Sequence, residues 1–219
     1  MRLVGLQKEL EQIYGIAIDY SVEDFLITDA DLVRQLDTSH NPRDIKEKLL
    51  ISHSEDCLEI SLYLDQKVVD HLTRENPLVG LNGGNLTEFC IAIEGVSHFL
   101  YLMWNALLEK PVTLLELEMQ AEVDKYITCL RLLQRQNKKL ISSRIREILF
   151  YRAQFDDALD QHALKRYKDA NFFAGKYCMQ LEHEYLKDRQ RPNWYPEIRN
   201  FYRLPQTEKI LRIQSGRVT

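Results

Sequence analysis

Residues 86–108 constrain the fold more than any other segment, because they are strongly apolar and contain no lysine or arginine. A helix of this length could cross a membrane. The segment nevertheless carries Glu88, Glu94, His98 and Asn105. A carboxylate near the middle of a bilayer costs about 2.5–3.5 kcal/mol even on a lenient insertion scale. We therefore expect the central helix of a soluble bundle, with no membrane partner.

Helical periodicity divides this segment into an apolar side and a polar side. The apolar side contains Phe89, Ile93, Val96, Leu100, Met103, Trp104 and Leu107. The polar side contains Thr87, Glu94, His98, Tyr101 and Asn105. A side that faced solvent would normally carry lysines or arginines, so we expect the polar side to face another element of the bundle. Its groups then need partners, because an unpaired buried polar group costs about 1–3 kcal/mol.

A second helix is expected to begin at Thr113, which has the spacing of a capping box with Glu116. Because the connection between the two helices is short, they should run antiparallel. Counting outward from the turn then places His98 level with Glu122, at the edge of the core-facing side. The residues of this second helix that we predict to point away from the core are Gln120, Asp124 and Arg131.

Glu94, His98 and Glu122 could therefore meet inside the bundle, and we predict them as metal ligands. Two carboxylates and an imidazole suit a divalent metal, the only cofactor that the residues suggest, and buried carboxylates also suit acid–base catalysis. Tyr101 and Asn105 would surround the ligands. The Glu-x-x-His motif of di-iron bundles and the His-Glu-x-x-His motif do not occur. A buried hydrogen-bonded network that sets helix register, or a partner interface, would explain the same pattern.

The whole sequence predicts a mainly α protein with a small antiparallel β hairpin, an α+β chain whose C-terminal two-thirds form a multi-helix bundle. The hairpin is predicted from alternating apolar residues in 57–64, preceded by the apolar run 48–53. A lone hairpin is marginally stable, so a third strand is expected at residues 16–20. Further helices are expected at residues 3–14, 65–74, 142–159 and 163–186. After residue 191 we expect an irregular tail with a last helical turn near residues 208–213.

Domain organisation depends on the glycine-rich loop at residues 75–84. This loop is a candidate hinge between a small α+β portion, residues 1–80, and a helical bundle with a basic, aromatic tail, residues 85–219. One continuous domain is the alternative. The stretch at residues 37–43 is expected to be a loop.

Charge is divided unevenly along the chain. Residues 1–130 carry 10 Lys and Arg against 23 Asp and Glu, a balance of −13, whereas residues 131–219 carry 19 against 10, a balance of +9. Either the two halves attract each other within one domain, or the basic half meets an acidic partner. Arginines and aromatics alternate in the tail, as at protein interfaces and phosphate contacts. The predicted partner-binding residues are Arg189, Arg191, Trp194, Tyr195, Arg199, Tyr202 and Arg203.

Three functions stay open at this level. The sequence contains no catalytic motif, which disfavours an enzyme. Our first expectation is a helical interaction or adaptor protein that docks on protein partners or self-associates. The alternative is a metal-dependent or acid–base enzyme at Glu94, His98 and Glu122. Nucleic-acid binding through the basic half is a second alternative, less favoured because the rest of the chain is acidic. Widely spaced cysteines and the charged N-terminal residues favour the reducing cytoplasm over a secreted protein.

Overall fold

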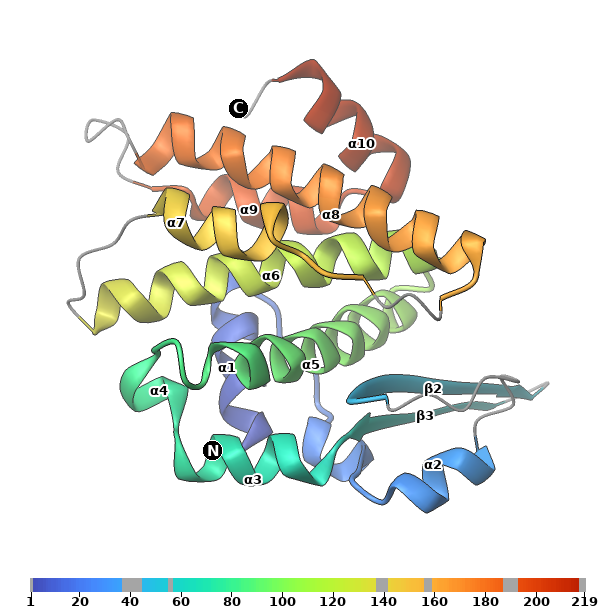
Figure 1. Ribbon diagram of the computed structural model, residues 1–219. Coiled ribbons are helices and arrows are strands. Elements are labelled where there is room, and N and C mark those ends of the chain that lie inside the picture. Colours follow the sequence, from blue (N-terminus) through green and yellow to red (C-terminus); the bar gives the residue numbers. More distant parts are fainter. Residues whose placement is uncertain are drawn as a thin grey trace.

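Two long antiparallel helices run through the centre of the protein (Figure 1). The structure is a computed structural model that describes residues 2–36, 45–54, 57–136, 142–155, 159–186 and 193–216. Helix α6 (Leu114–Arg135) lies between α5 (Leu86–Leu107) and α8 (Gln161–Leu181). Thr113 Oγ1 accepts a hydrogen bond from the Glu116 backbone N–H at 3.1 Å, which confirms the predicted start of α6.

Helix α5 is the one described helix that is long and apolar enough to cross a membrane. More than half of its most apolar stretch, 56%, is buried by the rest of the protein. Polar residues in its middle and C-terminal part are covered as well, since His98 and Asn105 are 7% and 5% exposed, whereas Thr87 in its first turn is exposed. A helix enclosed in this way fits the core of a soluble protein, as we predicted from the polar residues of this segment.

A small mixed sheet packs against α5. Strands β2 (Glu47–Ser54) and β3 (Cys57–Leu64) form the predicted hairpin, with Glu47 opposite Leu64. The third strand, β1 (Leu26–Ile27), pairs parallel with β3, so the order is β1-β3-β2. Together with the helices this confirms the predicted mainly α fold with a small β element.

The prediction of the third strand at residues 16–20 is wrong. The side chain of Gln7 binds the backbone around this segment: its Nε2 donates to Tyr20 O at 2.8 Å, and its Oε1 accepts from Val22 N–H at 2.8 Å. Backbone groups held by a helix are not available to a strand. The chain instead continues through a 3₁₀ turn, η1 (Val22–Phe25), before it reaches the sheet.

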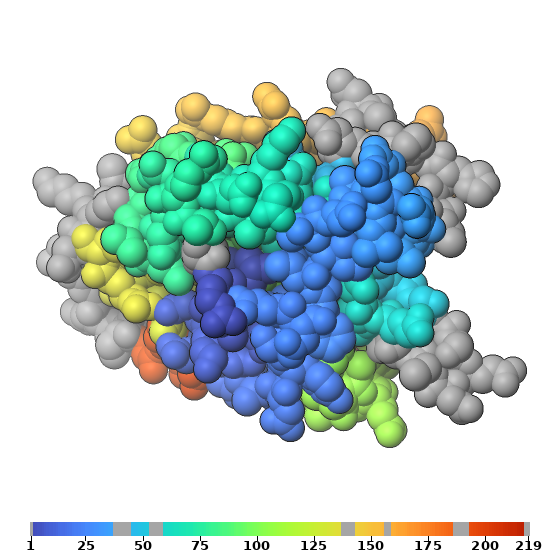
Figure 2. Space-filling view, turned by 90° about the horizontal axis from the view of Figure 1, so that it is seen from below, coloured from blue at the N-terminus to red at the C-terminus, as the bar shows by residue number. Residues whose placement is uncertain are grey.

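N-terminal segments cover one face of the molecule, the face that Figure 2 shows in blue and teal. The predicted helices at residues 3–14 and 65–74 are confirmed. The helices of this region are α1 (Leu3–Tyr14), α2 (Ala30–Leu36), α3 (Gln66–Arg74) and α4 (Pro77–Gly80). The loop predicted at residues 37–43 lies outside the described residues.

The C-terminal region is more helical than predicted at its end and less helical at its start. Instead of one helix over residues 142–159, α7 (Ser142–Arg146) passes into a π-helical turn, η2 (Glu147–Tyr151). The predicted helix at 163–186 is α8 with a π-helical extension, η3 (Glu182–Leu186). The tail forms α9 (Tyr195–Arg203) and α10 (Gln206–Ser215), so the helical turn predicted at residues 208–213 is confirmed and the irregular structure predicted before it is wrong for the described residues. Pro196 lies in the first turn of α9 and Pro205 caps α10, positions where a missing N–H costs no helical hydrogen bond.

A single cluster of buried apolar side chains joins these layers. It contains residues of α1, such as Leu6, of the sheet, such as Leu62, and of the central helices, such as Val123. Residues on both sides of the glycine-rich loop therefore contribute to one core. The division into portions 1–80 and 85–219 stays a prediction.

Candidate metal centre

The close approach of the sheet to α5 begins at Gly95. A Cβ atom at this position would lie 2.9 Å from Leu62 Cδ1, closer than real Cβ atoms come to a neighbour, and 3.0 Å from Glu47 Cγ, closer than most of them come. Glycine therefore lets β2 and β3 lie directly on the helix. As a consequence Glu47, at the start of β2, reaches the polar side of α5 between Glu94 and His98.

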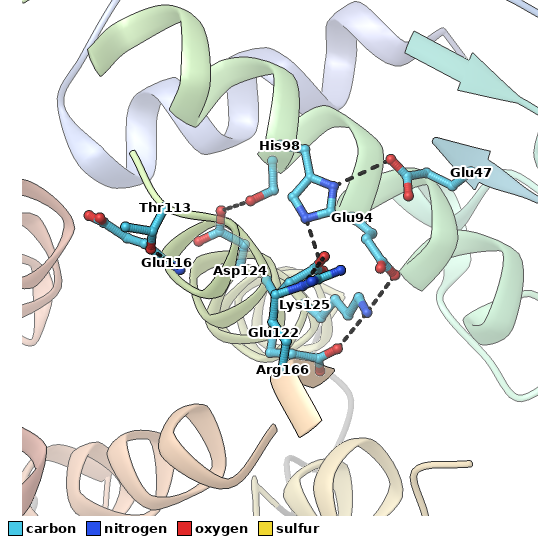
Figure 3. Close-up of polar contacts among 11 residues, drawn as sticks. Glu47, Glu94, His98, Thr113, Glu116, Glu122, Asp124, Lys125 and Arg166 are labelled. Atoms are coloured by element: carbon cyan, nitrogen blue, oxygen red, sulfur yellow. Dashed lines mark hydrogen bonds and ion pairs between the residues drawn. The ribbon is translucent and has the colours of Figure 1, made fainter. Parts of the chain in front are cut away.

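His98 lies between two carboxylates from different elements (Figure 3). Its Nδ1 makes a long hydrogen bond, 3.4 Å, to Glu47 Oε1. Its Nε2 is 3.4 Å from Glu118 Oε2 on α6 and forms an ion pair with it, but this nitrogen makes no hydrogen bond to any described residue. Burial alone would lower the pKa of His98, yet the charges of Glu47 and Glu118 raise it well above its ordinary value. The imidazole is therefore protonated near neutral pH.

Farther along α6, about two turns from Glu118, Lys125 forms ion pairs with Glu94 and Glu122. Its Nζ is 2.7 Å from Glu94 Oε2 and 2.8 Å from Glu122 Oε1, and its side chain is only 10% exposed. Burial would raise the pKa of Glu94, but the Lys125 ammonium and His98 lower it below its ordinary value. For Glu122 burial prevails over Lys125, so the pKa of this carboxyl is raised.

Glu47 also has a raised pKa, because the cost of burying its charge exceeds the attraction of His98. The four carboxyl groups around His98 and Lys125 are those of Glu47, Glu94, Glu118 and Glu122. Two of them, Glu47 and Glu122, therefore bind a proton more readily than an ordinary glutamate does, whereas Glu94 binds one less readily. Groups with such different proton affinities side by side can give and take protons.

One subset of these residues has the spacing of a metal site. Ligand atoms of Glu94, His98 and Glu118 all lie within 4.8 Å of one another. Glu94 and His98 thus meet as expected, but the third member is Glu118 in place of the expected Glu122, which instead contacts Lys125. Each carboxylate has two oxygens, so Glu94 can offer one to a cation and keep the other on Lys125.

Tyr101 and Asn105 do not contact this group. Asn105 Nδ2 donates to the Tyr101 backbone carbonyl at 2.8 Å, within the helix. The Tyr101 hydroxyl binds Glu116 and accepts from Lys209 Nζ at 2.9 Å. Lys209 comes from α10 and is fully buried; burial lowers its pKa to about 7.

The prediction that Gln120 and Asp124 point away from the core is wrong. They are 0% and 1% exposed, because α1 and α10 cover this side of α6. Ser97 Oγ donates to Asp124 Oδ2 at 2.6 Å, and Tyr14 donates to its other oxygen. Burial raises the pKa of Asp124 to about 6. These hydrogen bonds form a second buried network, which ties α1, α5, α6 and α10 together.

The residues predicted to bind a partner mostly have partners within the chain. Tyr202 is 1% exposed and stacks on Tyr14 with ring centroids 4.0 Å apart. Arg199 donates to the backbone carbonyls of Ile13 and Gln12, and Arg203 to those of Tyr14 and Gly15. Tyr195 accepts from Arg131, and Trp194 packs against the core. Arg189 and Arg191 lie outside the described residues.

A cavity of about 980 Å³ adjoins the carboxylates, bounded by β2, α5, α6, α8 and the chain around residues 148–155. Glu47, Glu94, Glu122 and Lys125 line one part of it, and Arg166 of α8 lies next to them. Arg166 Nε is 3.9 Å from Glu118 Oε1. The cavity therefore gives small molecules a place beside the acidic group.

Sequence reasoning missed Glu47, Glu118, Lys125 and Arg166. Only Glu118 had a signal, since it precedes Glu122 by four residues and shares its helix face. Glu47 is separated from His98 by 51 residues, and no local pattern connects them.

Comparisons of the chain with protein-family models, with curated proteins and with solved structures found no match. Function is therefore inferred from the residues of the site alone.

Proposed function

We propose that this protein is a metal-dependent enzyme that binds a divalent cation at Glu94, His98 and Glu118 and acts on a small molecule in the adjoining cavity. The observation that carries the proposal is the convergence of three ligand atoms within 4.8 Å, from helices α5 and α6. His98 Nε2, in a side chain 8% exposed, makes no hydrogen bond to a described residue and only a long ion pair, 3.4 Å, with Glu118 Oε2. Because a buried ring nitrogen without a hydrogen bond is costly, this atom favours a ligand.

The donor set defines the chemistry. Carboxylates suit Mg²⁺ and Mn²⁺, and an imidazole extends the range toward Fe²⁺ and Zn²⁺. Three protein ligands leave coordination positions for water and substrate. A cation held there would polarise a substrate oxygen or lower the pKa of bound water. The raised pKa values of Glu47 and Glu122 suit them to carry the proton that such chemistry moves.

An adaptor function has less support. The tail was its main basis, and Tyr202, Arg199 and Arg203 are engaged by α1. The same contacts weaken the case for nucleic acid, since Arg203 and Arg199 already neutralise the carbonyl end of a helix. Neither alternative has a described surface that points to a particular partner.

A titration with Mn²⁺ tests the proposal, with binding measured by calorimetry and by the electron paramagnetic resonance of the Mn²⁺ ion. We expect one site per chain. Loss of a residue that only hydrogen-bonds to a metal ligand weakens metal binding by roughly 10–100-fold. His98→Gln and Glu118→Gln each remove a ligand itself, so each should weaken Mn²⁺ binding by more than that. Glu122→Gln is the matched control on the same helix, and it should bind Mn²⁺ within about tenfold of the parent, because Glu122 pairs with Lys125 and not with a proposed metal ligand.

Equal Mn²⁺ affinity in the parent and in the Glu118→Gln variant would contradict the proposal. So would the absence of stoichiometric Mn²⁺ binding by the parent. Circular dichroism of each variant establishes that it is folded. Metal-dependent turnover is then measured on the substrate class derived below.

For the same protein we propose a cytoplasmic location. The described cysteines Cys90, Cys129 and Cys178 are free thiols, two of them buried, as expected where thiols stay reduced.

A further inference from the structure

The cavity beside the candidate metal centre has two chemically different parts. Its volume of about 980 Å³ is in the range of sites that enclose a small organic ligand. One part presents the charged side chains around Lys125 and Arg166. Apolar side chains line much of the remainder, among them Leu86, Ile91, Ile148, Leu149, Phe155 and Leu159, together with polar ones such as Lys46, Gln154 and Asn171. A ligand that fills it therefore needs a charged end and an apolar body.

Arg166 sets the sign of the charged end. Its guanidinium reaches the cavity from α8, with the side chain 27% exposed. Its Nε is buried and has no hydrogen-bond partner among the described residues, since Glu118 Oε1 is 3.9 Å away. A guanidinium has five N–H donors in a fork that matches the oxygens of phosphate and carboxylate. Because Glu118 makes only this long ion pair with Arg166, the guanidinium keeps N–H donors that can bind an anionic group in the cavity.

A phosphate group placed here could bind both to Arg166 and to the proposed cation. Three protein ligands leave open positions on a divalent cation, and such cations are commonly held by carboxylates together with substrate phosphates. Arg166 and the cation would then contact different oxygens of one group. Lys125 cannot take this role, because its ammonium is already shared by Glu94 and Glu122 at 2.7 and 2.8 Å.

We propose that the cavity binds an organic phosphate, with the phosphate between Arg166 and the cation and an apolar or aromatic body against the wall that contains Leu149 and Phe155. This deepens the proposed function and rests on it, because the surrounding carboxylates repel an anion when no cation is bound. Arg166 is thereby a substrate-binding residue, and phosphate esters are the substrate class.

Binding of 1-naphthylmethylphosphonate, a phosphonate that cannot be hydrolysed at its P–C bond, tests this in the presence of Mn²⁺. We expect it to bind at least about tenfold more tightly than either inorganic phosphate or 1-naphthol, because only the whole molecule occupies both parts of the cavity. Arg166→Gln should weaken the phosphonate by about tenfold or more, since a charge-assisted hydrogen bond is lost. Lys168→Gln, an exposed cation on the same helix, should leave it unchanged.

The outcomes separate this inference from the proposed function. If Mn²⁺ binds the parent but the phosphonate does not, the substrate class is overturned and the metal site stands. Equal phosphonate affinity in the parent and in Arg166→Gln overturns the role of Arg166 and with it the inference. If Mn²⁺ fails to bind, the proposed function falls and this inference falls with it, because the phosphate position needs the cation.

Discussion

At the scale of single residues, the unusual feature of this protein is the buried charge on His98. An isolated buried imidazole loses its proton, because a low dielectric disfavours the charged form. Here Glu47 and Glu118, on opposite ring nitrogens, more than offset that effect and raise the pKa of His98. The proton thus occupies the place that a cation would take. Folding and metal binding make opposite demands on the same side chain.

This competition predicts a pH dependence. Because the folded-state pKa of His98 lies above its unfolded value of about 6.5, its charge stabilises the fold fully below that pH. The contribution is lost as pH rises through the folded pKa. A metal must displace the proton, so Mn²⁺ affinity should increase with pH across the same window.

Calorimetry at pH 7 in two buffers of different ionisation enthalpy measures this exchange. About one proton should be released per Mn²⁺ bound, since one imidazole must lose its proton to become a ligand. The Glu122→Gln variant should release the same number. A release near zero in the parent would mean that His98 is either neutral or no ligand.

At the scale of elements, the tail helices act as a cap for the first helix. Helix α1 ends at Gly15, whose φ of 61° is a left-handed conformation that glycine adopts without strain. Its last carbonyls point toward α9, where the guanidinium groups of Arg199 and Arg203 bind them. Positive charge at the carbonyl end of a helix also favours its dipole. Arginines that resembled interface anchors are thus used to join the two ends of the chain.

Arg199→Ala tests this role of α9. Arg199 Nε and Nη2 each donate at 3.0 Å, so we expect the free energy of unfolding to fall by about 1.5–3 kcal/mol, the usual value of hydrogen bonds from a charged group. Urea denaturation measures the change. Arg34→Ala removes an exposed arginine that pairs only with Asp31 three residues away, and it should cost about 0–1 kcal/mol. Equal losses in the two variants would contradict the proposed cap.

At the scale of the whole molecule, the uneven charge is largely an internal attraction. Glu9 of the acidic half binds Arg131 and Arg135 of the basic half, with Arg131 Nε at 3.1 Å. Arg166 approaches Glu118, and Lys209 approaches Glu116 at 3.8 Å. The acidic part of the chain and the basic part therefore pack on each other. A charge balance of −13 against +9 does not by itself require an acidic partner.

Salt should therefore destabilise this protein. The Debye length falls from about 30 Å at 0.01 M to about 3 Å at 1 M, which screens attraction between the two halves. We expect the Tm to decrease as NaCl is raised over this range, and to decrease less in Glu9→Gln, which lacks the ion pairs to Arg131 and Arg135. A Tm that increased with NaCl would show that repulsion from the net charge of −4 dominates instead.

Much of the fold could be predicted from the sequence because its signals are local. The period of α5, the cap at Thr113 and the alternation of β3 each depend on neighbours within a few residues. The absence of lysine and arginine from α5 was enough to predict that its polar side is covered. The same pattern placed Glu94 and His98 on one side of the helix, where the structure has them in the same cluster.

Which residues meet them was decided by the tertiary structure alone. The rotation of α6 about its axis follows from what packs on all sides of it, and one helical turn separates Glu118 at His98 from Glu122 at Lys125. Glu47 arrives only because Gly95 lets the sheet lie on α5, and Arg166 only because α8 covers α6. Sequence patterns report which face of an element is covered, because burial follows its period. They do not report the covering residue, because that depends on contacts between segments distant in the chain.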